Sequence, residues 1–110
     1  MTIKSYVLEF SIPANSPWAR YASLFTPAGI SRTVREVRIW FGATSGARIR
    51  FYWETEYLFE ITAEVWNKYV VPHEVDWSIP AGTGVFVEGA NSTASAISVK
   101  IELIVEETRA

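Results

Sequence analysis

The only histidine of the chain, His73, is followed closely by two acidic residues, Glu74 and Asp76, in the segment VVPHEVDW. A serine–histidine–acid triad needs such a histidine beside a nucleophilic serine, but the sequence contains no Gly-x-Ser-x-Gly segment. A metal site is disfavoured as well, because on a strand Glu74 and Asp76 would point to one side and His73 to the other. We therefore predict that His73 is an exposed or hydrogen-bonded turn residue, with no catalytic role and no bound metal.

Paired carboxylates could support glycoside hydrolysis, and four glutamates are spaced to share one face of a continuous strand: Glu54, Glu56, Glu60 and Glu64. In a chain with eleven glutamates, such residues are more typical of a solvated face paired with Lys and Arg. A length of 110 residues also leaves little material for a deep cleft. The loop GATSG, residues 42–46, joins two expected strands rather than a strand and a helix, so it is not a phosphate-binding loop. We predict that the protein is not an enzyme, and a small glycoside hydrolase is the least favoured interpretation.

The composition excludes several other classes of protein. The absence of cysteine rules out disulfides, zinc–thiolate sites and thiol catalysis. The formal net charge is −2 and the isoelectric point is near 5.4, whereas a nucleic-acid-binding domain normally carries a basic excess. We therefore predict no cofactor and no nucleic-acid partner.

The composition also bears on where the protein works. The first ten residues, MTIKSYVLEF, alternate in polarity, and no stretch approaches the roughly 18 apolar residues of a membrane span. We therefore expect no signal peptide, no membrane insertion and synthesis in the cytoplasm. Glutamine and cysteine are absent and the one methionine is Met1, a depletion of thermolabile side chains that indicates a thermophilic source.

Apolar and polar residues alternate along most of the chain, and this period of two residues is typical of half-buried β-strands. These strands must position the side chains named above. It is clearest near the C-terminus, where Ile97, Val99, Ile101, Leu103 and Val105 alternate with mostly polar residues. Similar segments occur near residues 6–12, 37–41, 49–53, 57–65, 69–77 and 85–88, separated by turn residues. The sequence therefore predicts an all-β protein: a single antiparallel β-sandwich of about seven to eight strands spanning residues 1–110.

Two segments interrupt this pattern. Ser16-Pro17 is typical of a helix start, and aromatic residues follow at helical spacing, so we predict a short helical or irregular insert near residues 16–25 within a long connection, 13–31. The segment 62–69 is ambiguous between strand and helix.

The segments on either side of GATSG predict a hairpin. Symmetric closure would pair apolar residues on one face: Phe41 with Ala47, Ile39 with Ile49, and Val37 with Phe51. The other face would then gather three arginines and two aromatic residues, namely Arg38, Trp40, Arg48, Arg50 and Tyr52. These residue types dominate interface hot spots, so we predict a protein–protein interface there. The alternative is an intramolecular Arg–Glu ladder, for which Glu88 and Glu102 are the candidate acids.

Sixteen aromatic residues occur in the chain. Five suit the core: Phe10, Phe41, Phe51, Phe59 and Phe86. Four are expected near loops or outer positions: Trp18, Trp40, Trp66 and Trp77. Exposed aromatic clusters mark either protein interfaces or platforms on which sugars stack.

The segment VREVRIWFGATSGARIRFYW and, at a distance, SIPAGTGVFVEGANSTASAISVKIELIVEE resemble the β-sandwich, jelly-roll-like structural proteins of viruses and phages. The resemblance spans residues 33–107 and implies a capsid, turret or decoration subunit. We therefore predict a non-enzymatic structural subunit that self-associates, located in a virion or an extracellular assembly. The alternative is a carbohydrate-binding module that uses exposed Trp and Tyr.

Overall fold

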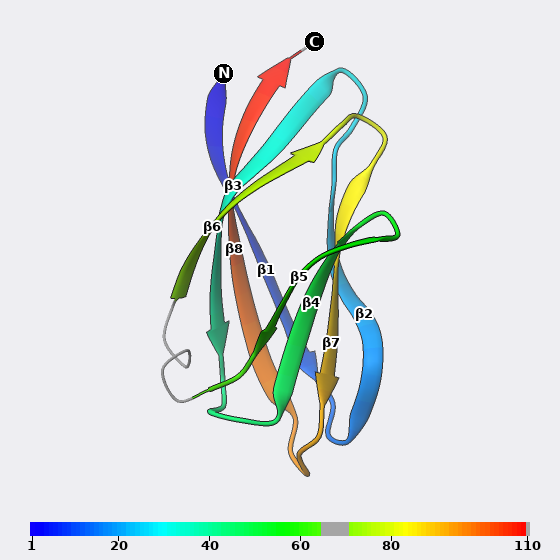
Figure 1. The fold of residues 1–110 in the computed structure, drawn as a ribbon, viewed down its shortest axis with the longest axis vertical. Coiled ribbons are helices and arrows are strands. Elements are labelled where there is room, and N and C mark those ends of the chain that lie inside the picture. Colours follow the sequence, from blue (N-terminus) through cyan, green and yellow to red (C-terminus); the bar gives the residue numbers. More distant parts are fainter. Residues whose placement is uncertain (65–70, 110) are drawn as a thin grey trace.

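The computed structural model describes residues 1–64 and 71–109, and its strands within these ranges form two antiparallel sheets (Figure 1). The strands are β1 (Thr2–Ile12), β2 (Ser16–Phe25), β3 (Ile30–Phe41), β4 (Ala47–Trp53), β5 (Glu56–Thr62), β6 (Val71–Ile79), β7 (Gly84–Asn91) and β8 (Ile97–Arg109). No helix of the described residues has the length and apolar character needed to cross a membrane.

Each sheet contains four strands. Sheet A has the order β1-β8-β3-β6, and sheet B has the order β2-β7-β4-β5. The pairs β1/β8, β2/β7, β3/β6 and β4/β5 are those of a long ribbon that is folded on itself and rolled into two layers. The fold is therefore the antiparallel β-sandwich that the sequence predicts. The molecule is elongated, with extents of 47 × 24 × 19 Å.

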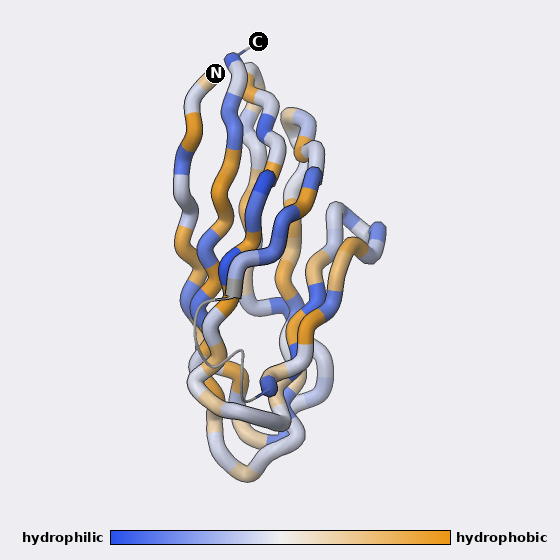
Figure 2. Tube along the Cα trace, turned by 60° about the vertical axis from the view of Figure 1, so that its left-hand side comes forward, coloured by the Kyte–Doolittle hydropathy of each residue, from blue (hydrophilic) through white to orange (hydrophobic). Residues whose placement is uncertain are grey.

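The core lies between the two sheets and follows the alternation of the sequence. On β8, which has neighbours on both sides, Val99, Ile101 and Leu103 point inward and are buried. The inward residues predicted around GATSG are buried too, among them Phe41 and Phe51, both fully enclosed. Figure 2 shows the result as alternating hydrophobic and hydrophilic positions along the strands.

The predicted helical or irregular insert near residues 16–25 is wrong, because this segment is strand β2. β2 is an edge strand, where Pro17 can lie without removing a ladder hydrogen bond. Its pairing with β7 has two register shifts, between Ser16 and Ala19 and between Arg20 and Ala22. These bulges break the repeat of two residues and leave aromatic side chains at a spacing that imitates a helix. Of the ambiguous segment 62–69, Thr62 ends β5, and residues 65–70 lie outside the described residues.

The predicted hairpin about GATSG is also wrong. β3 and β4 belong to different sheets, so Phe41 lies opposite Val99 and Ala47 lies opposite Asn91. The five-residue loop crosses from one sheet to the other. Both arrangements place the same residues inside, which is why the predicted core survives the error in pairing.

Three aromatic or imidazole side chains differ from their predicted positions. Phe86 is half-buried among outward-facing residues of β7, while Val85 and Val87 beside it are buried. Trp77 packs against the core instead of lying outside, with its ring centroid 5.4 Å from that of Phe51. His73 lies within strand β6 rather than in a turn and is half-buried. Trp66 lies outside the described residues.

Candidate contact surfaces

The structure divides the five predicted interface residues between two faces of the molecule. Arg38 and Trp40 lie on the outer face of β3 in sheet A, whereas Arg48, Arg50 and Tyr52 belong to β4 in sheet B. The two sheets stack, so these outer faces point in opposite directions. The predicted repulsion between Arg38 and Arg50 therefore does not arise.

The outer face of sheet B is organised around Arg50. This side chain donates to Glu88 on β7 at 2.8 Å, and its guanidinium carbon lies 4.0 Å from the ring centroid of Trp18 on β2. The Arg48 guanidinium also lies over Trp18, at 5.1 Å, and donates to Glu60 on β5 at 2.6 Å. One tryptophan and two arginines are thus held together by acids from two neighbouring strands.

The same face extends along its neighbours. The Arg20 guanidinium lies 3.9 Å from the ring centroid of Phe86. Tyr52 meets Tyr57 edge to face, with centroids 6.0 Å apart, and Tyr57 is 55% exposed. We call this surface the arginine–aromatic face; its members are Trp18, Arg20, Arg48, Arg50, Tyr52, Tyr57, Glu60, Phe86 and Glu88.

Only part of the arginine–aromatic face could be found from the sequence. The alternation along β4 predicts Arg48, Arg50 and Tyr52 on this face. Glu88 is predicted as an acid that lies beside an arginine. Trp18 and Arg20 were missed because bulges hide the strand that carries them. Phe86 could have been found, since Val85 and Val87 take the inward positions on either side of it.

The outer face of sheet A carries a second arrangement around Arg38. This arginine donates hydrogen bonds to Glu36 at 2.8 Å and to Glu102 at 3.0 Å, and these two bonds raise its pKa. The pairing of arginines with Glu88 and Glu102, which the sequence offers as the alternative to an interface, is thus present within the chain. Next to it, half-buried Trp40 borders a groove of about 460 Å³ whose other walls are Glu9, Phe10, Ser11, Ser98, Val99 and Lys100.

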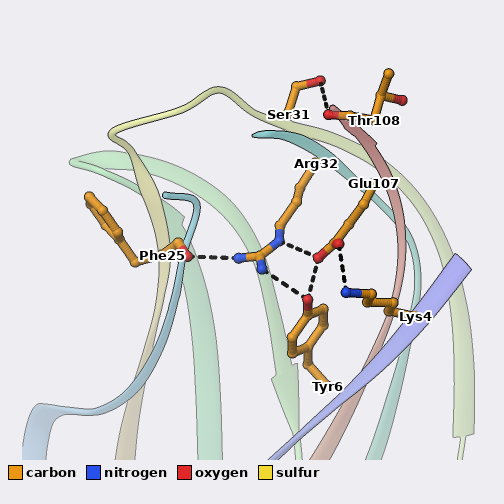
Figure 3. Close-up of polar contacts among 7 residues, drawn as sticks. All are labelled: Lys4, Tyr6, Phe25, Ser31, Arg32, Glu107 and Thr108. Atoms are coloured by element: carbon orange, nitrogen blue, oxygen red, sulfur yellow. Dashed lines mark hydrogen bonds and ion pairs between the residues drawn. The ribbon is translucent and has the colours of Figure 1, made fainter. Parts of the chain in front are cut away.

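One end of the sandwich is closed by a buried charged cluster (Figure 3). Arg32 on β3 and Glu107 on β8 point inward and are 9% and 7% exposed. Arg32 donates to Glu107 at 2.7 Å, to the Phe25 carbonyl on β2 at 2.7 Å, and to the Tyr6 hydroxyl on β1 at 2.9 Å. Tyr6 donates in turn to Glu107, and Lys4 forms an ion pair with the same carboxylate at 3.1 Å. The cluster therefore ties the first half of β1 to both sheets.

This cluster shifts the protonation of its members. The hydrogen bond from Tyr6, followed by those from Arg32 and Lys4, lowers the pKa of Glu107 to about 2, although burial opposes the change. Burial and the hydrogen bond to Glu107 raise the pKa of Tyr6. The charged and polar groups of the cluster pair with one another, so the cluster holds strands together.

His73 points to the opposite side of β6 from Glu74 and Asp76, so these three side chains do not form one site. His73 faces the ring of Phe59, with centroids 5.1 Å apart, and burial lowers its pKa. Glu74 and Asp76 point outward from the same strand, as predicted, and Asp76 pairs with Arg35. Within residues 1–64 and 71–109, no group of three or more His, Cys, Asp or Glu side chains could hold a metal ion.

The fold and surfaces thus define a β-sandwich with two ordered outer faces. No protein-family model matches the sequence, and a search of the curated proteins finds no match. Among solved structures, the chain is similar to one in the acid-stable capsid of Helicobacter pylori bacteriophage KHP30, with a TM-score of 0.54, 16% identity, and coverage of 96% of this chain and 94% of that one.

Two further solved structures share the fold. A family 35 carbohydrate-binding module from an environmental isolate has a TM-score of 0.53 and 14% identity, covering 90% of this chain and 74% of that one. PliG of Aeromonas hydrophila, a periplasmic inhibitor of g-type lysozyme, has a TM-score of 0.50 and 14% identity, covering 93% and 86%. The predicted likeness to β-sandwich structural proteins of phages is therefore confirmed at the level of fold.

Proposed function

We propose that this chain is a non-enzymatic structural subunit that associates with copies of itself in a larger protein assembly, such as a virion. The observation that carries the proposal is the arginine–aromatic face. Arginine, tryptophan and tyrosine supply most of the affinity in protein interfaces. Here ion pairs to Glu60 and Glu88 already hold Arg48 and Arg50 in place, so little side-chain entropy is lost on binding. Coverage of both chains almost from end to end in the phage capsid comparison supports a virion setting.

The experiment compares the parent with two tryptophan variants by sedimentation and native mass spectrometry. The parent should form a defined oligomer. Trp18→Ala removes the ring beneath Arg48 and Arg50 and should weaken association by about 2 kcal/mol or more. Trp40→Ala is the matched control, because it removes a half-buried tryptophan from the opposite outer face.

Each result has a distinct meaning. Loss of association in Trp18→Ala alone supports the arginine–aromatic face. Loss in Trp40→Ala alone would move the contact to sheet A and contradict the assignment to sheet B. A parent that stays monomeric at every concentration would overturn the proposed function.

The second candidate function is carbohydrate binding, and the Trp40 groove favours it. Trp40 has no aromatic or cation–π partner among residues 1–64 and 71–109, and polar side chains of Glu9, Ser11 and Lys100 border its groove. On the arginine–aromatic face, by contrast, guanidinium groups cover one side of the Trp18 and Phe86 rings. A soluble polysaccharide should then raise the thermal midpoint of the parent and of Trp18→Ala, but not that of Trp40→Ala. Equal shifts in all three proteins would contradict binding in this groove.

We also propose that the protein works at high temperature. Arg35 bridges Asp76 and Glu106, and Arg38 bridges Glu36 and Glu102, so charges on sheet A form networks rather than isolated pairs. Such networks stabilise proteins more at high temperature, because ions then lose less hydration free energy on pairing. A thermal midpoint within the range of about 45–65 °C that is usual for mesophilic domains would contradict this proposal.

A further inference from the structure

The edges of the two sheets are protected unequally. An unprotected edge strand offers its free backbone N–H and C=O groups to another strand, and proteins prevent this with prolines, bulges or charges. Among the residues that the structure describes, four strands lie at the edges of the sheets. β2 carries Pro17 and two bulges, β6 carries Pro72 and a register shift, and β5 pairs irregularly with β4 at Leu58. Of these four described edges, only β1 pairs with its neighbour residue by residue, from Thr2 to Ile12, with no proline and no shift.

The accessible part of this edge is the first half of β1. Toward its end, the ring of Phe10 stacks on Tyr21 of β2 with centroids 5.4 Å apart, and Ile12 is buried. At its start, residues 2–5 are exposed on both sides of the strand. Figure 2 shows this strand along the left-hand margin of the molecule. The free edge therefore comprises residues 2–8.

The side chains of this edge are apolar where a solvated edge would be charged. Ile3 is 62% exposed and Val7 is 50% exposed, and both point to the outer face of sheet A with Ser5 between them. The charge of Lys4 is bound to Glu107 of the neighbouring strand at 3.1 Å, so it does not guard the edge. Exposed β-branched residues on a regular edge indicate pairing with another strand.

We propose that residues 2–8 pair antiparallel with the same residues of a second copy, about a two-fold axis at Ser5, so that the two A sheets join into one. This inference rests on the proposed function and adds a second contact to the one proposed on the arginine–aromatic face. Residues opposite each other in an antiparallel pair lie on the same face of the sheet. The two-fold axis must therefore pass through a residue and not between two residues.

Among those registers, an axis at Ser5 sets Ile3 against Val7 of the other copy. By symmetry, Val7 also lies against Ile3 of the other copy, so the dimer contains this apolar pair twice. An axis at Lys4 would oppose two lysines. An axis at Tyr6 would set Ile3 against Glu9. An axis at Val7 would set Ile3 against Ser11 and draw in Phe10, which is already stacked on Tyr21. The strand is therefore complementary to itself in one register, which makes a second copy the expected occupant.

Cysteine cross-linking tests the register directly, because the natural chain has no cysteine. In Ser5→Cys the two sulfur-bearing residues would face each other across the axis, at a Cα separation of about 4.5–5.5 Å that suits a disulfide. Ser11→Cys is the matched control: it is the same substitution on the same strand and face, but its copies would lie roughly 40 Å apart. Under mild oxidation, Ser5→Cys should form covalent dimer at least about tenfold faster than Ser11→Cys.

A second variant tests the edge without cysteine. The double substitution Ile3→Lys and Val7→Lys places charges opposite each other in the dimer and should abolish it at concentrations where the parent associates. Because both side chains are half-exposed or more, the thermal midpoint of the monomer should change little.

The outcomes separate this inference from the proposed function. A parent that associates while Ser5→Cys cross-links no faster than Ser11→Cys overturns pairing through β1 and leaves the proposed function standing. Association that is as strong after the double lysine substitution as in the parent overturns it as well. A parent that is monomeric throughout overturns both.

Discussion

Replacement of Glu107 by Gln should cost stability through the loss of one buried charge. The carboxylate accepts hydrogen bonds from Tyr6 and Arg32 and pairs with Lys4, and the amide leaves Arg32 enclosed without its counter-charge. A pKa that falls on folding from 4.5 to about 2 corresponds to about 3 kcal/mol at neutral pH, as an upper bound. Removing one partner of a buried ion pair costs a similar amount, about 3–5 kcal/mol.

The dependence on pH has a definite sign. Because folding lowers the pKa of Glu107, the stability that its ionised form contributes is complete above the unfolded value of 4.5 and is lost as the pH falls toward about 2. The variant has no titrating group at this position. Urea denaturation of both proteins between about pH 7 and about pH 3 should therefore show a difference in unfolding free energy that narrows with acid.

The neighbouring residue supplies the control. Glu106→Gln makes the same chemical change, but Glu106 pairs with Arg35, whose side chain is 46% exposed, so the loss should stay below about 1 kcal/mol. Equal losses in the two variants, or a Glu107→Gln deficit that does not change with pH, would refute the reasoning about the cluster.

Three further predictions concern Ile101 in the core, His73 within β6 and Gly46 in a loop. Ile101→Ala empties a fully buried position of β8 and should cost about 2–5 kcal/mol in urea denaturation, with the amides of this strand among the slowest to exchange in the parent. His73→Leu should leave the free energy of unfolding unchanged near neutral pH and reduce the loss of stability in acid. Because burial lowers the pKa of His73, the stability that the neutral imidazole contributes is present above about pH 6.5 and is lost as the pH falls. An acid profile of the variant that matches the parent would contradict this. Gly46→Ala should lower the thermal midpoint more than Gly29→Ala does. Both glycines have positive φ, but only at Gly46 would the new Cβ clash, at 2.2 Å from the Thr93 methyl group. Equal decreases in the two midpoints would contradict the clash.

The sequence predicts which way a residue faces better than which strand it pairs with. Inward positions on β3, β4 and β8 follow from alternation alone, because burial of an apolar face requires it. The loop 42–46 is short enough for a hairpin and also long enough to cross between sheets. Both choices bury Ile39 and Ile49, so no apolar pattern distinguishes them. Pairing of Arg38 with Glu102 and of Arg50 with Glu88 was nevertheless predictable, because an arginine facing outward needs an acid on an adjacent strand.

Strand β2 shows where the rule of alternation fails. A bulge shifts the facing of every residue after it, so Trp18, Tyr21 and Phe25 occur at a helical spacing within a strand. Pro17 strengthens the wrong interpretation, although an edge strand accommodates it. The arginine–aromatic face depends on Trp18, and its full extent therefore required the structure. The Arg32–Glu107 cluster was hidden for another reason: both residues occupy inward positions, where the pattern predicts apolar side chains.

The two surfaces proposed for assembly differ in how far their polar groups already have partners within the chain. On the arginine–aromatic face, Arg48 and Arg50 each contact both a carboxylate and a ring, so a partner there must match a fixed arrangement of charges and rings. Such a surface selects the geometry of association. The edge of β1 is the opposite case, because its outer side pairs with no strand of the described residues and the side chains of Ile3 and Val7 are exposed. Pairing there gains hydrogen bonds and buries apolar area, and the ties from Lys4 and Tyr6 to Glu107 keep the strand in place beforehand. In the proposed assembly, both surfaces would therefore add affinity, and the fixed charges of the arginine–aromatic face would also set the orientation of the partner.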